Sequence, residues 1–276
     1  MILPVLSRGR ENSRAPLCTE NGFSIRIPGF GRDGDAGMKT IRSALLWCAG
    51  GICFCFFFLI VALGLIIADG RTIYPAVHVL GRIQLLSMGL RLRVHGCDRF
   101  EPRRSYLIMG NHESMFDVFA IPAALPMHAV GIEADYHFSI PLWGYLTRKW
   151  GNIPITRENR TQAIRALDGA TRILRAGTSI VVLPEGHRTL NGQVGPFKKG
   201  PFHLALAAGA DNLPFAVSGL YEYRSKEGWH LSPRTAHVAF GAPIAYESYK
   251  DSTVDDILFR VHREIVALKD DRSRVP

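Results

Sequence analysis

A histidine and an aspartate separated by four residues are the feature of this sequence that most suggests chemistry. His112 and Asp117 belong to the stretch from Asn111 to Asp117, which follows the apolar run from Tyr106 to Met109. Ligands tend to bind beyond the carboxyl ends of strands in open α/β sheets. The order of these residues therefore predicts a reactive site at the end of a strand.

The spacing of this pair restricts how the two side chains can meet. Five residues turn a regular helix through about 500°, so on one helix the side chains would point about 140° apart. They meet only if His112 lies in the turn before the helix. The carboxylate could then hold one ring nitrogen and raise the basicity of the other, which would take a proton from a substrate hydroxyl. In the alternative interpretation His112 caps a helix and Asp117 is solvated.

A long uncharged segment precedes the pair. The 26 residues from Ser43 to Ala68 contain no charged side chain, which is enough to cross a bilayer core of about 30 Å. Thr72 to Leu90 carries an apolar stripe at helical spacing, which fits either a helix in the membrane interface or one packed on the core. Arginines follow the run as well as precede it, so charge does not separate a full crossing from a half-immersed hairpin broken at Gly50-Gly51 or Gly64.

The chain after Gly96 has the composition of an α/β domain. One amphipathic helix is predicted to end at Gly177, and another near the C-terminus begins with the cap-like residues Ser252 and Asp255. Helices alternate with strands, which favours a mixed, largely parallel sheet covered by helices. The candidate strands are Tyr106 to Met109, Ala129 to Ile132, Asn152 to Ile155, Ser179 to Leu183, Leu213 to Val217 and Ala236 to Phe240.

These segments divide the 276-residue chain into three expected parts. Residues 1–42 form a basic, disordered segment, in which Met38 is a second possible start; residues 43–95 form a membrane-anchoring apolar segment with an amphipathic helix; residues 96–276 form the α/β domain. The net charge of +9 suits anionic lipid surfaces, phosphorylated substrates or nucleic acid.

Basic residues follow two further predicted strands. Arg157 comes after one strand and Arg188 after another, with Lys198 in the loop that follows Arg188. A guanidinium fork matches phosphate oxygens, so the two arginines and one lysine could form a phosphate-binding cluster. Each of them taken singly is more often a solvated surface charge.

Several other enzyme classes are excluded by missing motifs. His112-Glu113 begins like a zinc protease helix, but Phe116 stands where the second histidine is required, and the five cysteines show no metal-ligand spacing. The chain has no Gly-x-Ser-x-Gly elbow of an α/β-hydrolase and no nucleotide-binding glycine-rich loop. The sequence therefore predicts no metal site.

Four short motifs in order make the chain similar to the membrane-bound glycerolipid acyltransferases of the lysophosphatidic acid acyltransferase type. The third motif departs from the family's usual form, with His187 in place of Thr and Thr189 in place of Ser. The matching residues are His112 and Asp117; Gly151, Ile153, Ile155 and Arg157; Leu183 to Thr189; and Leu213, Pro214 and Phe215.

This resemblance implies transfer of a fatty acyl group from acyl-CoA or acyl-carrier protein to the sn-2 hydroxyl of 1-acylglycerol-3-phosphate, giving phosphatidic acid. It implies that His112 is the base and that Asp117 orients it. Five residues would then bind the acceptor. Glu185, Gly186 and Arg188 would lie near the glycerol phosphate, Arg157 would bind its phosphate, and Lys198 would contribute a further positive charge. The expected partners are the lipid bilayer, the lysophospholipid and the acyl donor, with no cofactor and no nucleic acid.

The resemblance also implies a membrane location, expected to be a bacterial inner membrane with the active site facing the cytoplasm. Three alternatives remain open. One is an acyltransferase for another lysolipid, such as a lyso-ornithine lipid, with His187 as the residue that differs. Another is a hydrolase or transacylase that uses the same pair of residues, and the third is a non-catalytic membrane lipid-binding protein.

Overall fold

Seven strands of the described chain form one sheet. The computed structural model describes residues 36–156, 160–224 and 228–271, without the side chains of residues 160–165. The strand order is β1-β7-β6-β2-β5-β3-β4. The bounds are β1 Leu90–His95, β2 Leu107–Gly110, β3 Ala129–Ala134, β4 Ile153–Ile155, β5 Ser179–Val182, β6 Asn212–Ser218 and β7 Arg234–Phe240.

The sheet is mixed and largely parallel, as the sequence predicts. Five neighbouring strands, from β6 to β4, run in the same direction, while β7 is antiparallel to β6 and parallel to β1. The carboxyl ends of β2, β5 and β6 therefore meet at one edge of the sheet. This edge brings together the loops that follow Gly110, Val182 and Ser218.

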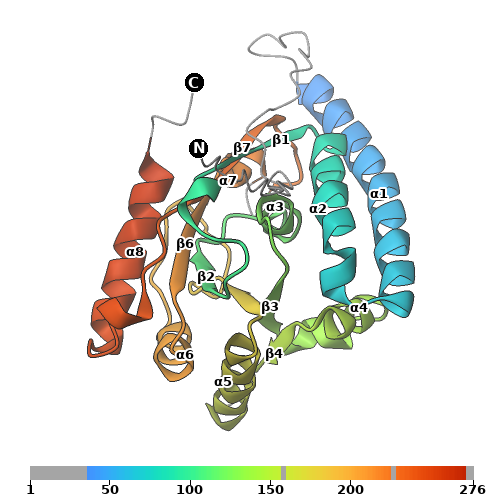
Figure 1. The fold of residues 1–276 in the computed structure, drawn as a ribbon. Coiled ribbons are helices and arrows are strands. Elements are labelled where there is room, and N and C mark those ends of the chain that lie inside the picture. Colours follow the sequence, from blue (N-terminus) through green and yellow to red (C-terminus); the bar gives the residue numbers. More distant parts are fainter. Residues whose placement is uncertain (1–35, 157–159, 225–227, 272–276) are drawn as a thin grey trace, which may run out of the picture.

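Helices cover both faces of the sheet (Figure 1). Alternate residues of β2 face opposite sides: Ile108 belongs to the core with α2 and α3, and Leu107 and Met109 belong to the core with α5, α6 and α8. Burying each of these side chains contributes about 1.5–3 kcal/mol, which fixes the strand before the reactive stretch. The helices are α1 Ala36–Ile67, α2 Gly70–Ser87, α3 Asp117–Ala124, α4 Trp143–Trp150, α5 Arg160–Arg175, α6 Gly200–Ala208, α7 Leu220–Tyr223 and α8 Val254–Asp270.

The apolar segment forms one continuous helix that folds back into a hairpin with α2. The break that Gly50-Gly51 or Gly64 could have produced does not occur. The chain turns at Asp69, whose carboxylate caps α2 through the amide of Thr72. Gly50 instead allows close packing: a Cβ at this position would lie 2.5 Å from the Met88 side chain. Among the described helices, α1 alone is long and apolar enough to cross a membrane.

Helix α1 contacts the α/β domain along most of its length. Near its start, the hydroxyl of Ser43 accepts a hydrogen bond from the backbone amide of Leu231, at 3.0 Å. In its middle, Phe57 packs edge-on against Phe119 of α3, with ring centroids 5.7 Å apart. Near its end, Leu65 packs in a cluster with α4. The helix therefore lies against the side of the domain and does not extend away from it (Figure 1).

The structure corrects two details of the sequence analysis. Strand β1, Leu90–His95, was missed, so the sheet includes residues that the sequence analysis assigned to the anchoring segment before residue 96. This strand alternates leucine and arginine at the sheet edge, and only its pairing with the distant β7 reveals it. Helix α8 is capped by Thr253, with Asp256 completing the capping box, one residue later than expected.

Candidate active site

His112 and Asp117 meet in the geometry that the spacing requires. His112 lies in the loop after β2, and Asp117 is the first residue of α3. Nδ1 of His112 lies 2.6 Å from Oδ2 of Asp117. The Asp117 side chain is 3% exposed, which excludes the alternative of a solvated carboxylate, while the imidazole is 25% exposed. The pair therefore presents a partly open ring held from behind by a buried carboxylate.

The surroundings of Asp117 keep its carboxylate in place. Its Oδ2 also accepts hydrogen bonds from the backbone amides of Glu113, at 2.9 Å, and Ser114, at 3.2 Å. Burial raises the pKa of Asp117, and the hydrogen bond from His112, the amide of Ser114 and the charge of Arg188 oppose that rise. A carboxylate that accepts from Nδ1 leaves Nε2 as the basic nitrogen, and Nε2 forms no hydrogen bond within the part of the chain that the structure describes.

The backbone of His112 is fixed by the loop that follows β5. Its amide donates to Oε1 of Glu185 at 2.8 Å, and its carbonyl accepts from the amide of Thr189 at 2.8 Å. Oε2 of Glu185 accepts from the amide of Gly195 at 3.0 Å. Glu185 is 1% exposed, and burial raises its pKa. With both oxygens turned to backbone amides, Glu185 positions His112, and its expected role near the glycerol phosphate stays a prediction.

Asn111 fixes the other side of the loop by extending the β2–β6 pairing. Its Nδ2 donates to the carbonyl of Val217 at 2.9 Å, and its Oδ1 accepts from the amide of Val217 at 2.7 Å. The preceding residue must be glycine, because a Cβ on Gly110 would lie 2.3 Å from the ring of Phe215. The start of the reactive loop is therefore held to β6 by two hydrogen bonds and a close packing contact.

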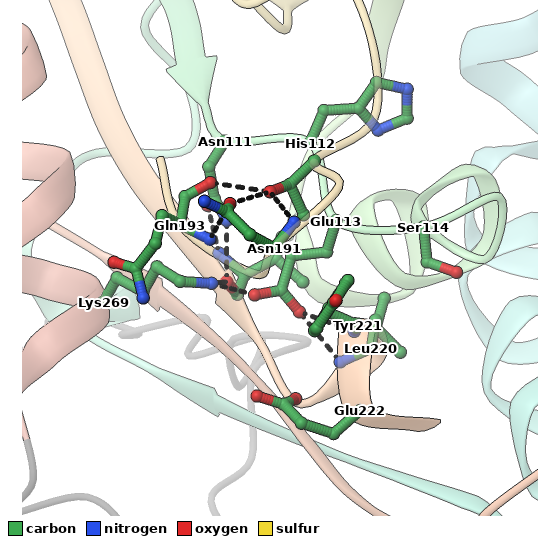
Figure 2. Close-up of polar contacts among 12 residues, drawn as sticks. Asn111, His112, Glu113, Ser114, Asn191, Gln193, Leu220, Tyr221, Glu222 and Lys269 are labelled. Carbon is green, nitrogen blue, oxygen red and sulfur yellow. Dashed lines mark hydrogen bonds and ion pairs between the residues drawn. The ribbon is translucent and has the colours of Figure 1, made fainter. Parts of the chain in front are cut away.

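Glu113 ties this loop to two further elements. Its Oε1 pairs with Nζ of Lys269 in α8, and its Oε2 accepts from the amides of Leu220, at 2.8 Å, and Tyr221, at 3.1 Å. Figure 2 shows this carboxylate between Lys269 and the start of α7, with the imidazole of His112 pointing away from the cluster. No role for Asn111 and Glu113 was predicted from the sequence. Their polar side chains directly beside His112 are the signal that could have identified them.

The other predicted binding residues lie at different depths in the same loops. Arg188 is half-buried and close enough to Asp117 to affect its pKa. Gly186 has φ +73°, and the exposed Lys198 lies over it, with its Cε 3.1 Å from where a Cβ would be. Arg157 lies outside the described residues. The structure thus brings Arg188, Gly186 and Lys198 into the loop beside His112, and their binding roles stay predictions.

The chemistry available at this site is proton transfer. An imidazole oriented by a buried carboxylate can remove a proton from a hydroxyl and return it to a leaving group. No group of three or more His, Cys, Asp or Glu side chains suited to a metal ion occurs in the part of the chain that the structure describes. The geometry by itself fits a general base acting on a ligand at the edge of the sheet.

Residues 91–218 match the family model Acyltransferase, and this range contains His112, Asp117, Glu185 and Arg188. A 1-acyl-sn-glycerol-3-phosphate acyltransferase from Limnanthes douglasii is 27% identical over 186 residues, covering 67% of this chain and 66% of that protein. The alpha form from Mus musculus is 31% identical over 171 residues, covering 61% of this chain and 59% of that protein. The Haemophilus influenzae enzyme of the same name is 29% identical over 157 residues, covering 56% of this chain and 65% of that protein.

The fold is also that of a solved structure, the 1-acyl-sn-glycerophosphate (LPA) acyltransferase from Thermotoga maritima. The TM-score is 0.69 at 20% sequence identity, over 83% of this chain and 98% of that one. The match to the Limnanthes relative spans 66% of its length, and the residues that match the family model, 91–218, begin in β1 and end in β6 of the sheet. Residues 91–218 of this chain, with the paired histidine and aspartate at the end of β2, are therefore similar to the Acyltransferase family.

Proposed function

We propose that this protein is a 1-acylglycerol-3-phosphate O-acyltransferase. It moves a fatty acyl group from acyl-CoA or acyl-carrier protein to the sn-2 hydroxyl of the acceptor and forms phosphatidic acid. The observation that carries this proposal is the imidazole of His112, held by Asp117 at 2.6 Å and partly open to solvent. The names of the relatives support the choice of acceptor.

The reaction proceeds by direct transfer. Nε2 of His112 takes the proton of the acceptor hydroxyl as its oxygen attacks the thioester carbonyl, which contributes roughly 10² to 10⁴ in rate. The new C–O bond forms, the C–S bond breaks, and the imidazolium returns its proton to the leaving thiolate. Asp117 stabilises the imidazolium throughout, and Glu185 keeps the ring's backbone in place. No acyl-enzyme intermediate is required.

The oxyanion formed during attack needs hydrogen-bond donors near the thioester carbonyl. The amide of Gly186 donates to the carbonyl of Leu183 at 3.0 Å, and that of Lys198 donates to Pro184 at 2.9 Å. These two amides are therefore engaged within their own loop. We assign no oxyanion donor among them.

The protein works at a membrane surface, because its acceptor is a lipid. Helix α1 is apolar enough to enter a bilayer, and its contacts with the domain from Ser43 to Leu65 support a half-immersed hairpin with α2. A full crossing would require α1 to leave the domain that it packs against. Both acyl donors are cytosolic, so we place the site on the cytoplasmic face of a bacterial inner membrane.

Acyl transfer by purified protein in detergent tests this proposal. Labelled acyl-CoA and acyl-carrier protein are each offered with lysophosphatidic acid, a lyso-ornithine lipid or another lysophospholipid, to wild type and to His112→Ala. His203→Ala is the matched control, since His203 is exposed on α6. We expect phosphatidic acid from wild type and the control and none from His112→Ala.

Other outcomes separate the alternatives. Transfer to a different lysolipid keeps the mechanism and changes the acceptor. Product without any thioester donor indicates a hydrolase or transacylase. No transfer with either donor, together with retained lipid binding by His112→Ala, would support the non-catalytic alternative.

A further inference from the structure

Arg224 lies between the reactive loop and the anchoring helix. It follows α7 as its C-terminal cap residue, and its Nη1 lies 3.4 Å from the sulfur of Met115, in the loop that joins His112 to Asp117. Its guanidinium carbon lies 5.8 Å from the centre of the Trp47 ring of α1, and that ring packs against Phe116 at 6.0 Å. Arg224 therefore sits where the domain, the reactive loop and the apolar helix meet.

The half-buried guanidinium of Arg224 has no carboxylate partner among the residues that the structure describes. Neither Arg224 nor Arg188 forms an ion pair with a carboxylate in the described ranges, and Nε of Arg224 is buried without a hydrogen-bond partner there. A thioether sulfur is a weak acceptor. Within the described part of the chain, a half-buried guanidinium with a buried, unsatisfied Nε and only a sulfur acceptor has donors available for an anion.

A second positive charge lies close by. Burial and the charge of Arg188 both lower the pKa of Arg224, so the two guanidinium groups are near enough to repel each other. Arg188 directly precedes Thr189, whose amide donates to the carbonyl of His112 at 2.8 Å. Arg224 contacts Met115 of the same loop, so both arginines lie on segments that contact the reactive loop. Two adjacent guanidinium groups near one histidine match a substrate that carries a doubly charged group next to its hydroxyl.

We propose that Arg224 and Arg188 together bind the phosphate monoester of the acceptor, and that the ring of Trp47 in α1 packs against the guanidinium of Arg224 and holds it in place. This inference rests on the proposed function and names a residue outside the four motifs that suggested it. A phosphate monoester carries between −1.5 and −2 charges at pH 7, whereas a lysophospholipid diester carries one on its phosphate. The pair of arginines therefore selects acceptors with a terminal phosphate.

Binding without acyl donor tests this inference. Equilibrium binding of lysophosphatidic acid and of the 1-monoacylglycerol with the same chain is measured in mixed micelles for wild type, Arg224→Gln and Arg234→Gln. Arg234 of β7 is the matched control, since its guanidinium is already paired with Glu222 of α7. Losing one charge-assisted hydrogen bond to phosphate weakens binding about 10- to 100-fold. We expect that loss for lysophosphatidic acid with Arg224→Gln, and no change for monoacylglycerol or for the control.

Turnover provides a second measurement. Arg224→Gln should raise the KM for lysophosphatidic acid by the same factor and leave kcat nearly unchanged. Arg224→Lys keeps the charge but not the two-pronged guanidinium, so its affinity for lysophosphatidic acid should fall less, by about 3- to 10-fold. If Arg224→Gln does not fold, the binding of Arg224→Lys tests the role of Arg224 in its place. Unchanged binding, or equal weakening for both lipids, would overturn the role of Arg224. Wild type that neither binds nor acylates lysophosphatidic acid would instead overturn the proposed function itself.

Discussion

Replacing Glu185 with glutamine separates a positioning role from a substrate-binding role. Both oxygens of the buried carboxylate accept backbone amides, from His112 at 2.8 Å and Gly195 at 3.0 Å. Glutamine keeps one acceptor oxygen, but its NH₂ group faces the other backbone amide. One charge-assisted hydrogen bond is then lost, and two N–H donors point at each other. That loss costs about 2–3 kcal/mol, since an unmade buried hydrogen bond carries its full desolvation penalty.

The effect should appear in both stability and turnover. A destabilisation of this size lowers the unfolding temperature of a chain this long by about 4–12 °C. Displacing the backbone of His112 by even about 1 Å can cost 10²-fold in rate, so we expect kcat to fall by one to two orders of magnitude while the KM for lysophosphatidic acid changes little. Thermal unfolding and steady-state acyl transfer in one detergent measure both quantities.

The matched control is Glu222→Gln, since the Glu222 side chain is 54% exposed; it should be neutral in both assays. The opposite pattern for Glu185→Gln would refute the positioning argument. An unchanged unfolding temperature with a raised KM would mean that Glu185 contacts the acceptor, as the family resemblance implied.

Three further perturbations have defined outcomes. Asp117→Asn removes the charge that stabilises the imidazolium of His112 and should lower kcat by roughly 10² to 10⁴ at constant KM; full activity would exclude the pair as the base. Gly110→Ala places a methyl group against Phe215 and should cost about 1–3 kcal/mol in denaturant unfolding; an unchanged midpoint would show that the ring can move at no cost. Burial lowers the pKa of His128 to about 4, so the unfolded chain binds a proton below about pH 6.5 that the folded chain does not. The free energy of unfolding should therefore fall by about 1–2 kcal/mol between pH 6.5 and 4, after allowance for partial exposure, and His128→Phe should remove that loss; equal pH profiles would contradict it.

The sequence was sufficient where the signal was local. The apolar run before His112 predicts β2, and the five-residue interval requires His112 to lie ahead of the helix that starts at Asp117, as the structure has it. The alternation of strands and helices predicts the mixed sheet. In contrast, β1 was missed, because it depends on pairing with the distant β7. The glycines of the apolar run left a break possible, and only the packing of Gly50 against Met88 shows a continuous helix there.

Residue type and spacing alone determined the fold class, the apolar helix and the reactive pair. Only the tertiary structure decided what surrounds that pair. Glu185 lies 73 positions from His112, and Lys269 lies 156 positions from Glu113, so no local pattern could reveal that these carboxylates hold the reactive loop. Arg224 belongs to no motif, and its place beside Trp47 follows from the packing of α1 on the domain. Long-range contacts like these arise only when the strands close into one sheet and bring distant loops to the same edge.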